Sequence, residues 1–390
     1  MKTKLFFLTL TVAALCLRAA ANALAVPQYA ITDLGLLPSL QYGPVERGAF
    51  ALNDAGQVAG GDGHAFLWSG SKKTDLGVLP PEGIEDFAHS VAYGINNRGQ
   101  VVGSSGSFGT IFMSGLQFAR GILYQNGRLR QLTQWNSSFE PFAINDKGRI
   151  VGMDDYRGFL YENGRLTRLG TLSSVPVGNR STARAVNASG QIVGWSTVNA
   201  GRSGPPYVET DREVKRHGKW VMETVRRVPT RTFFTHACLW HVSGKVVRQR
   251  DLGTLPGWVN SYAYAVNDRG EVIGSVADAT GRPYGVNADS RAQAFLCRDG
   301  RMIGLGTLPG CRSSEAFGLS NGGAVVGQSG GKAFLWQGGK LRDLNALIPA
   351  GAGWVLTEAR AINDRGQIVG NGTLHGQPHA FLLTPHGGRT

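Results

Sequence analysis

The chain has 390 residues, with 40 lysines and arginines against 27 aspartates and glutamates, and a formal net charge of +13 at pH 7. Its 56 glycines suit a fold with many tight turns. After the N-terminus no long apolar run, linker or low-complexity tract interrupts the sequence, which argues against a membrane-spanning protein and against separate modules joined by linkers.

The first 25 residues have the pattern of a secretory signal peptide. Lys2 and Lys4 precede an apolar run from Leu5 to Leu17, and Ala23-Leu24-Ala25 supplies small residues at the two positions that a signal peptidase reads. We therefore predict a secreted mature protein, residues 26–390, with a net charge of +10 because three cations leave with the leader. Cys16 follows a leucine rather than a small residue, which argues against a lipid anchor.

A cassette of the form Asn-Asp-x-Gly-Gln-hydrophobic-hydrophobic-Gly then recurs seven times. Four apolar segments in each copy predict four strands, as in Ala-Phe-Ala-Leu-Asn, Gln-Val-Ala-Gly, His-Ala-Phe-Leu-Trp and Lys-Thr-Asp-Leu-Gly-Val-Leu of the first copy. Four strands in about 40 to 50 residues are typical of one blade of a β-propeller. The copies begin at Asn53, Asn96, Asn145, Asn187, Asn267, Ser320 and Asn363.

The two ends of this array complement each other. The chain opens with a fourth-strand motif, Tyr29 to Gly35, and the last cassette stops after its third strand, His379 to Leu383. Pairing the two segments would complete the last blade and leave no unpaired edge. We predict an all-β fold: a single seven-bladed β-propeller with four-stranded blades, whose N-terminal strand closes the last blade.

Three cysteines remain in the mature chain, an odd number that cannot all pair with one another. Cys238 and Cys297 replace aromatic residues of the third strand, which favours buried thiols. A disulfide between Cys297 and Cys311 is the alternative.

The cassette resembles the HAF repeat of predicted extracellular bacterial proteins. The resemblance is carried by Asp-Leu-Gly-Thr-Leu-Pro-Gly at 251–257, Ala-Ile-Asn-Asp-Arg-Gly-Gln-Ile-Val-Gly at 361–370, and His-Ala-Phe at 64–66 and 379–381. It covers nearly all of residues 29–385, although the copies at 120–124 and 157–161 have Arg in place of His. The resemblance implies a secreted repeat protein, and it transfers no catalytic residue.

Most polar residues of the motif are expected to serve the scaffold. The aspartates of Asn-Asp-x-Gly are predicted to form tight turns rather than to bind metal, so we expect neither a metal nor a cofactor; they are Asp54, Asp146, Asp268 and Asp364. His64, His236 and His379 recur at one blade position, and we expect each to make a hydrogen bond to the backbone. Arg184 and Arg360 replace an aromatic residue of the innermost strand and should pair with carboxylates or face the central channel.

Candidate binding residues lie where the repeat is interrupted. The connections from second to third strands vary most in length, and in a propeller they share one face with the connections between blades, so we predict binding on that face. The longest is the blade-four insertion, residues 195–235, which is net positive by four. The predicted contacts to an anionic ligand are Arg212, Lys215, Arg216, Trp220 and, in another insertion, Arg282.

Three functions fit these features. We favour a secreted, monomeric binding module for an acidic polysaccharide or an anionic envelope component, with no specific nucleic-acid partner. A uronate polysaccharide lyase is the second: it would need a base, a cation for the carboxylate and a proton donor. His217 or His89 would be the base, Arg212, Arg216 or Arg282 the cation, and Tyr207 or Tyr284 the donor. A structural or protein-interaction repeat is the third, because no catalytic motif occurs in the chain.

Overall fold

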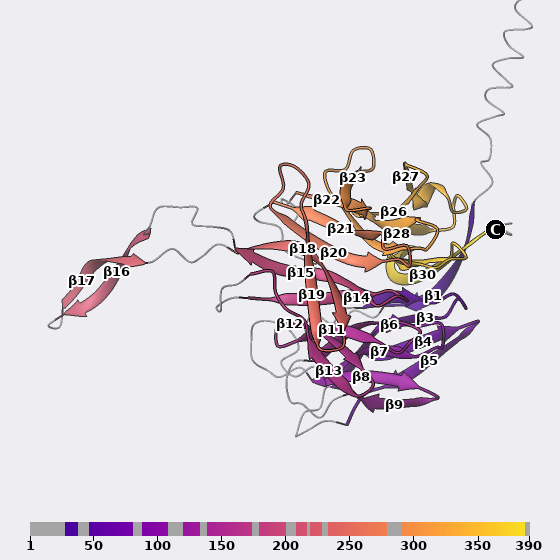
Figure 1. The fold of residues 1–390 in the computed structure, drawn as a ribbon. Coiled ribbons are helices and arrows are strands. Elements are labelled where there is room, and N and C mark those ends of the chain that lie inside the picture. Colours follow the sequence, from indigo (N-terminus) through magenta and orange to yellow (C-terminus); the bar gives the residue numbers. More distant parts are fainter. Residues whose placement is uncertain are drawn as a thin grey trace, which may run out of the picture.

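The computed structural model describes residues 28–37, 47–80, 88–107, 120–132, 139–173, 179–199, 208–216, 219–227, 233–278 and 291–386. These residues form seven four-stranded antiparallel sheets arranged in a ring (Figure 1), which confirms the prediction of a seven-bladed β-propeller. The 3-10 turn η1 (Leu344–Ala346) is the one helical element in these ranges, and no helix in them is long and apolar enough to cross a membrane. The predicted signal peptide, residues 1–25, lies outside the described residues.

The strands of each blade follow one another outward from the axis. Blades one to three consist of β2 (Gly48–Leu52), β3 (Val58–Gly61), β4 (Ala65–Ser69) and β5 (Lys72–Gly77); of β6 (Ala88–Ile95), β7 (Val101–Ser107), β8 (Arg120–Gln125) and β9 (Arg128–Gln131); and of β10 (Phe139–Ile144), β11 (Ile150–Asp154), β12 (Arg157–Glu162) and β13 (Arg165–Arg168). Blades four to six consist of β14 (Ser181–Val186), β15 (Gln191–Asn199), β18 (Phe233–Ser243) and β19 (Val246–Gly253); of β20 (Asn260–Val266), β21 (Val272–Ala277), β22 (Ala292–Arg298) and β23 (Arg301–Gly306); and of β24 (Ser314–Leu319), β25 (Val325–Ser329), β26 (Lys332–Gln337) and β27 (Lys340–Asp343).

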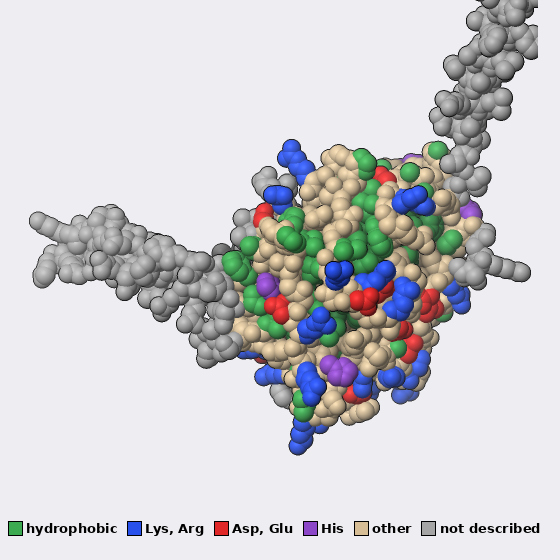
Figure 2. All heavy atoms as spheres, turned by 45° about the horizontal axis from the view of Figure 1, so that its top comes forward, with side chains coloured by type: hydrophobic (Ala, Val, Ile, Leu, Met, Phe, Trp, Pro, Cys, Tyr) green, Lys and Arg blue, Asp and Glu red, His purple; other side chains and the backbone are tan. Residues whose placement is uncertain are grey.

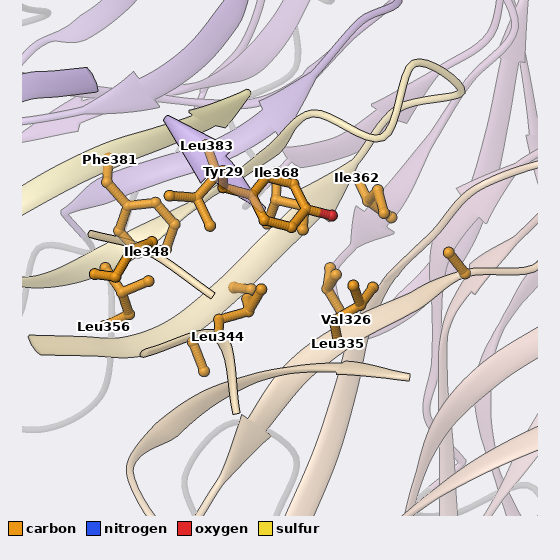
Figure 3. Close-up of a cluster of buried hydrophobic side chains, with 13 residues drawn as sticks. Tyr29, Val326, Leu335, Leu344, Ile348, Leu356, Ile362, Ile368, Phe381 and Leu383 are labelled. Atoms are coloured by element: carbon orange, nitrogen blue, oxygen red, sulfur yellow. The ribbon is translucent and has the colours of Figure 1, made fainter. Parts of the chain in front are cut away.

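Blade seven is closed by the N-terminal strand, as predicted. Its strands are β28 (Trp354–Ile362), β29 (Ile368–Leu374), β30 (Gln377–Pro385) and β1 (Tyr29–Leu36), and β1 pairs antiparallel with β30. Tyr29 is 7% exposed and belongs to the apolar cluster between blades six and seven (Figure 3). Its backbone N–H donates to the carbonyl of Leu347 at 3.1 Å. A hydrogen-bonded ladder and a buried aromatic ring therefore hold the closing strand.

Every innermost strand has a β-bulge at the same place. In β2 the pairing with β3 shifts between Ala49 and Ala51, so that Phe50 is left out of the ladder, and the equivalent strands of the other six blades shift in the same way. The bulge explains why the cassette ends in glycine. A Cβ on Gly194 would overlap the carbonyl oxygen of Thr182, which the bulge brings close.

The asparagine that opens each cassette ties its blade to the next one. Asn53 Nδ2 donates to the carbonyl of Asn96, and Asn96 Nδ2 donates to that of Asn145, both at 3.0 Å. Asn145, Asn187, Asn267 and Asn363 make the same bond at 2.9–3.2 Å. The Oδ1 of Asn53 meanwhile accepts the N–H of Gln57, so this buried amide is satisfied. Ser320 takes the position in blade six and has no amide to donate to blade seven.

Replacing Tyr29 with alanine should destabilise the protein by about 3 kcal/mol, because a fully packed aromatic ring is lost from the junction of blades six and seven. Urea unfolding followed by tryptophan fluorescence measures the change. Leu36→Ala is the matched control in the same strand, since Leu36 is 51% exposed and should cost far less. Equal effects of the two substitutions would show that β1 contributes only through its backbone.

The asparagine bonds predict a reciprocal pair of substitutions. Asn145→Ser should lower the free energy of unfolding by about 1 kcal/mol or more, because the bond to Asn187 is lost. Ser320→Asn should raise it by up to about 1 kcal/mol by completing the ring at the junction of blades six and seven. Thermal unfolding of both variants checks the signs. A destabilised Ser320→Asn protein would contradict this account of the ring.

Candidate functional site

The antiparallel order of the strands gives the ring two unlike faces. The turn face carries the first-to-second and third-to-fourth turns, and the loop face carries the second-to-third connections and those between blades. Turns on the first are short and uniform: Asn126-Gly127 and Asn163-Gly164 have the positive φ that tight hairpins need. On the loop face, the connection between β25 and β26 has two residues, whereas that between β15 and β18 comprises residues 200–232. The blade-four insertion is thus shorter than the predicted 195–235, because β15 extends to Asn199 and β18 begins at Phe233.

Four of the predicted site residues lie outside the described ranges: Tyr207, His217, Arg282 and Tyr284. Four others lie on a hairpin, β16 (Val208–Arg216) and β17 (Lys219–Arg227), which forms a sheet separate from the blades (Figure 1). Lys215 pairs with Trp220, and Arg216 pairs with Lys219. The predicted basic residues Arg212, Lys215 and Arg216 therefore lie on β16, and Trp220 lies on β17.

His89 lies in a cavity of about 570 Å³ on the loop face, between blades one and two. His64, Phe66, Lys73, Asp62 and Asp75 line the same cavity. Lys73 Nζ forms an ion pair with Asp62 and lies 4.6 Å from the centre of the Phe66 ring. No arginine or tyrosine is among the described lining residues, so Lys73 rather than a predicted arginine is the cation beside His89 there.

The recurring histidines are paired with aspartates of the fourth strand. The Nδ1 atoms of His64, His236 and His379 lie 2.8–2.9 Å from carboxylate oxygens of Asp75, Asp251 and Asp33. The expectation of a backbone partner was wrong, because the Asp-Leu-Gly strand runs beside each histidine. Comparison of the repeats contains the signal: where the fourth strand has Gln131, Arg168 or Gly304 instead of Asp, the third strand has no His.

These pairs also account for the acidity of two of the carboxyls, those of Asp75 and Asp251. Burial opposes the negative charge on Asp75 and Asp251, yet hydrogen bonds from His64 and His236 hold the pKa of both carboxyls below the usual range. The backbone N–H groups of Gly77 and Gly253 add to this effect at 2.7 Å each. The histidine and aspartate therefore form a charge-assisted link between the two outer strands of a blade.

The seven bulge residues form a ring inside the central channel. They enclose a cavity of about 120 Å³ and are Phe50, Tyr93, Phe142, Arg184, Tyr264, Phe317 and Arg360. Neighbouring rings of Phe50, Tyr93 and Phe142 have their centres 5.6–5.9 Å apart. Arg184 lies 4.0 Å above the Phe142 ring, and Arg360 lies 4.6 Å above that of Phe317. Both arginines therefore face the channel, as one of the two expectations had it.

Arg360 also fulfils the other expectation, because it pairs with a carboxylate. Its Nη2 lies 2.8 Å from Glu358 Oε2, and Glu358 Oε1 accepts from Asn371 Nδ2 at 2.7 Å. Asn371 Oδ1 in turn accepts the N–H of Ala49 in blade one at 3.1 Å. The guanidinium is thus held by a chain of polar groups that crosses the junction of blades seven and one.

Glu315, which the sequence analysis missed, lies next to this network. It is 3% exposed and accepts from Gln328 Nε2 at 2.7 Å. Burial raises its pKa, the bond from Gln328 and the charge of Arg360 oppose the rise, and the Glu358 carboxylate adds to it. Glu315 and Glu358 each stand two residues before a bulge residue, a spacing by which the sequence marks them.

The channel mouth on the turn face is lined by the cassette turns. Asp54, Asp146, Asp268 and Asp364 are turn residues, as predicted, and some of them also link blades: Asn97 Nδ2 donates to Asp54 at 3.0 Å and to Asp146 at 3.2 Å. A layer of Leu, Ile and Val side chains separates them from the aromatic ring. Within the described parts of the chain, no three His, Cys, Asp or Glu residues are grouped to hold a metal ion.

All three cysteines of the propeller are free thiols. Cys238 and Cys297 are buried, as predicted, and burial raises the pKa of both thiols. The alternative disulfide between Cys297 and Cys311 is not formed.

No family model matches the chain, and no curated protein does. Among solved structures, it is similar to a gluconolactonase from Xanthomonas campestris (13% identity, TM-score 0.37), with 77% of this chain and 90% of that chain covered. It is also similar to the extracellular domains of a putative one-component and a putative hybrid two-component system from B. thetaiotaomicron (10% identity, TM-scores 0.46 and 0.49). These matches cover 90% and 91% of this chain, which spans about two fifths of those chains (39% and 40%). The likeness is one of fold alone.

Glu315→Gln should stabilise the protein at neutral pH. Because the pKa of this carboxyl is raised in the folded protein, its contribution to the free energy of unfolding is complete below the ordinary pKa of about 4.3. That contribution is lost as the pH rises through the pKa of the folded protein. Urea unfolding at a series of pH values should give equal stabilities for both proteins near pH 4 and a growing advantage for Glu315→Gln above it. An advantage that did not change with pH would contradict the assignment.

Proposed function

We propose that the protein is a secreted binding module whose loop face holds an acidic polysaccharide of the cell envelope or its surroundings. The observation that supports this best is the division of the ring into two faces. All long connections leave the loop face, where a rigid scaffold can carry them, while the turns opposite stay short. Such an arrangement is suited to a ligand larger than the central channel.

The cavity around His89 has groups that suit a sugar acid. Two imidazoles and an ammonium group can donate hydrogen bonds to carboxylate and hydroxyl oxygens, and Asp62 and Asp75 can accept from sugar hydroxyls. Its volume of about 570 Å³ lies in the range of small-ligand sites. The cavity is therefore the part of the loop face that we assign to a uronate residue.

The hairpin β16–β17 supplies a second basic element, in the connection between β15 and β18 on the loop face. Arg212, Lys215 and Arg216 lie on β16, and Lys219 and Trp220 lie on β17. A polymer that lay across the loop face and reached the hairpin would meet basic residues there, which would lengthen the contact. Salt should weaken such binding steeply, because cations released from the polymer drive association.

The test is calorimetric titration of the mature protein with oligogalacturonate, with a neutral oligosaccharide of equal length as the comparison ligand. His89→Ala should weaken binding about tenfold, the loss expected for one hydrogen bond to a charged group. The hairpin variant Arg212→Gln/Arg216→Gln/Lys219→Gln should weaken it further and flatten its dependence on salt.

His241→Ala is the matched control, because His241 is an exposed histidine of β18 outside the cavity. Binding that is insensitive to His89 and to the hairpin would refute the assignment of the ligand to the loop face. Release of ultraviolet-absorbing unsaturated ends from the oligogalacturonate, abolished by His217→Ala or His89→Ala, would replace the binding module by a lyase.

A further inference from the structure

The turn face has a basic rim that repeats with the blades. Each third-to-fourth-strand turn of blades one to six ends in or is followed by an exposed lysine or arginine: Lys72, Arg128, Arg165, Lys245, Arg301 and Lys340. None of these six forms an ion pair with another described residue. Asp299 is the one acidic residue within these six turns. The rim is therefore strongly cationic.

A second set of cations lies nearer the axis. The variable residue of Asn-Asp-x-Gly is basic and exposed in four blades, at Arg98, Lys147, Arg269 and Arg365. The turn aspartates lie inside this set, at the channel mouth. The turn face thus presents an acidic centre surrounded by basic residues. Over the side seen in Figure 2, Lys and Arg side chains are interspersed with Asp and Glu.

Most turns of the turn face end at one level, and the chain ends meet there. The third-to-fourth-strand turns of blades one, two, three, five and six have the same register, whereas the hairpin of blade four extends two residue pairs further, to Ser243 and Val246. The carbonyl of Gln28, just before β1, accepts the N–H of His386, just after β30, at 2.9 Å. The first and last described residues, Gln28 and His386, therefore both lie at the turn face.

We propose that the turn face docks on an anionic lipid bilayer, with its basic rim against the phosphate headgroups and its loop face directed away. Cations that stand at one level around five blades can touch a planar surface together, whereas a linear polymer would reach only those along its path. Docking in this orientation leaves the loop face open to its ligand.

The strength of this interaction should follow the number of cations. Near an anionic membrane each lysine or arginine contributes about a fivefold factor to binding, and the attraction is screened within about 10 Å at 0.1 M salt. Removing four rim cations should therefore abolish most of the binding, without a change in the fold, because all four side chains are exposed.

The experiment measures co-sedimentation of the mature protein with vesicles of phosphatidylcholine, with and without phosphatidylglycerol. The rim variant is Lys72→Gln/Arg128→Gln/Arg165→Gln/Lys340→Gln. The matched control replaces four exposed cations of the loop face: Arg180, Arg291, Arg312 and Lys332, each by glutamine. We expect salt-sensitive binding to the anionic vesicles only, lost by about a hundredfold or more in the rim variant and kept in the control.

Equal loss in both variants would show attraction by net charge alone and would overturn the proposal, as would binding that neither variant changes. If the rim variant lost affinity for soluble polygalacturonate as strongly as for vesicles, the rim would be a site for linear polyanions and the bilayer would be the wrong partner. The His89→Ala variant separates this proposal from the proposed function, because it should lose the oligosaccharide and keep the vesicles.

Discussion

The amide side chains of the cassette asparagines are the contacts on which the ring depends. A propeller blade packs only against its two neighbours, so the spacing at the axis must be held blade by blade. Each amide does this by donating to the next blade while its oxygen accepts its own turn's N–H groups, as at Asn96. Because the amide is buried, leaving it unsatisfied would be costly, and the turn and the blade junction are therefore formed together.

The fold could be predicted from the sequence because its determinants repeat. Seven copies of one pattern gave the blade number, and unmatched motifs at the two ends, at Tyr29 and His379, gave the closure. The bulge could not be predicted, because it is a property of strand pairing. Its one sign in the sequence is the glycine opposite it, and a glycine is equally typical of a turn. The partners of the histidines were missed because the link between His and Asp shows only when the third and fourth strands of all blades are compared.

The channel shows how charges can occupy an apolar position of a repeat. Two arginines stand where five blades have aromatic rings, and a guanidinium that is partly removed from water needs compensation. For Arg184 the face of Phe142 provides it; for Arg360 the Phe317 ring and Glu358 do. A second carboxyl in the region, Glu315, has its pKa raised by burial; the charge of Arg360 opposes this rise, and that of Glu358 adds a little to it. The aromatic partners of the two arginines could not be predicted, because Phe142 and Phe317 belong to the neighbouring blades.

The contrast between the two faces follows from turn chemistry. A tight turn such as Asn126-Gly127 fixes the backbone at two positions and leaves the next residue free of any geometric demand, so that residue can carry charge without affecting the fold. Repeating the turn in each blade then repeats the charge around the rim. The loop face is under no such constraint, and its connections differ in length and composition from blade to blade. Regular charge is therefore suited to a broad, uniform surface, and irregular loops are suited to a ligand with a particular shape.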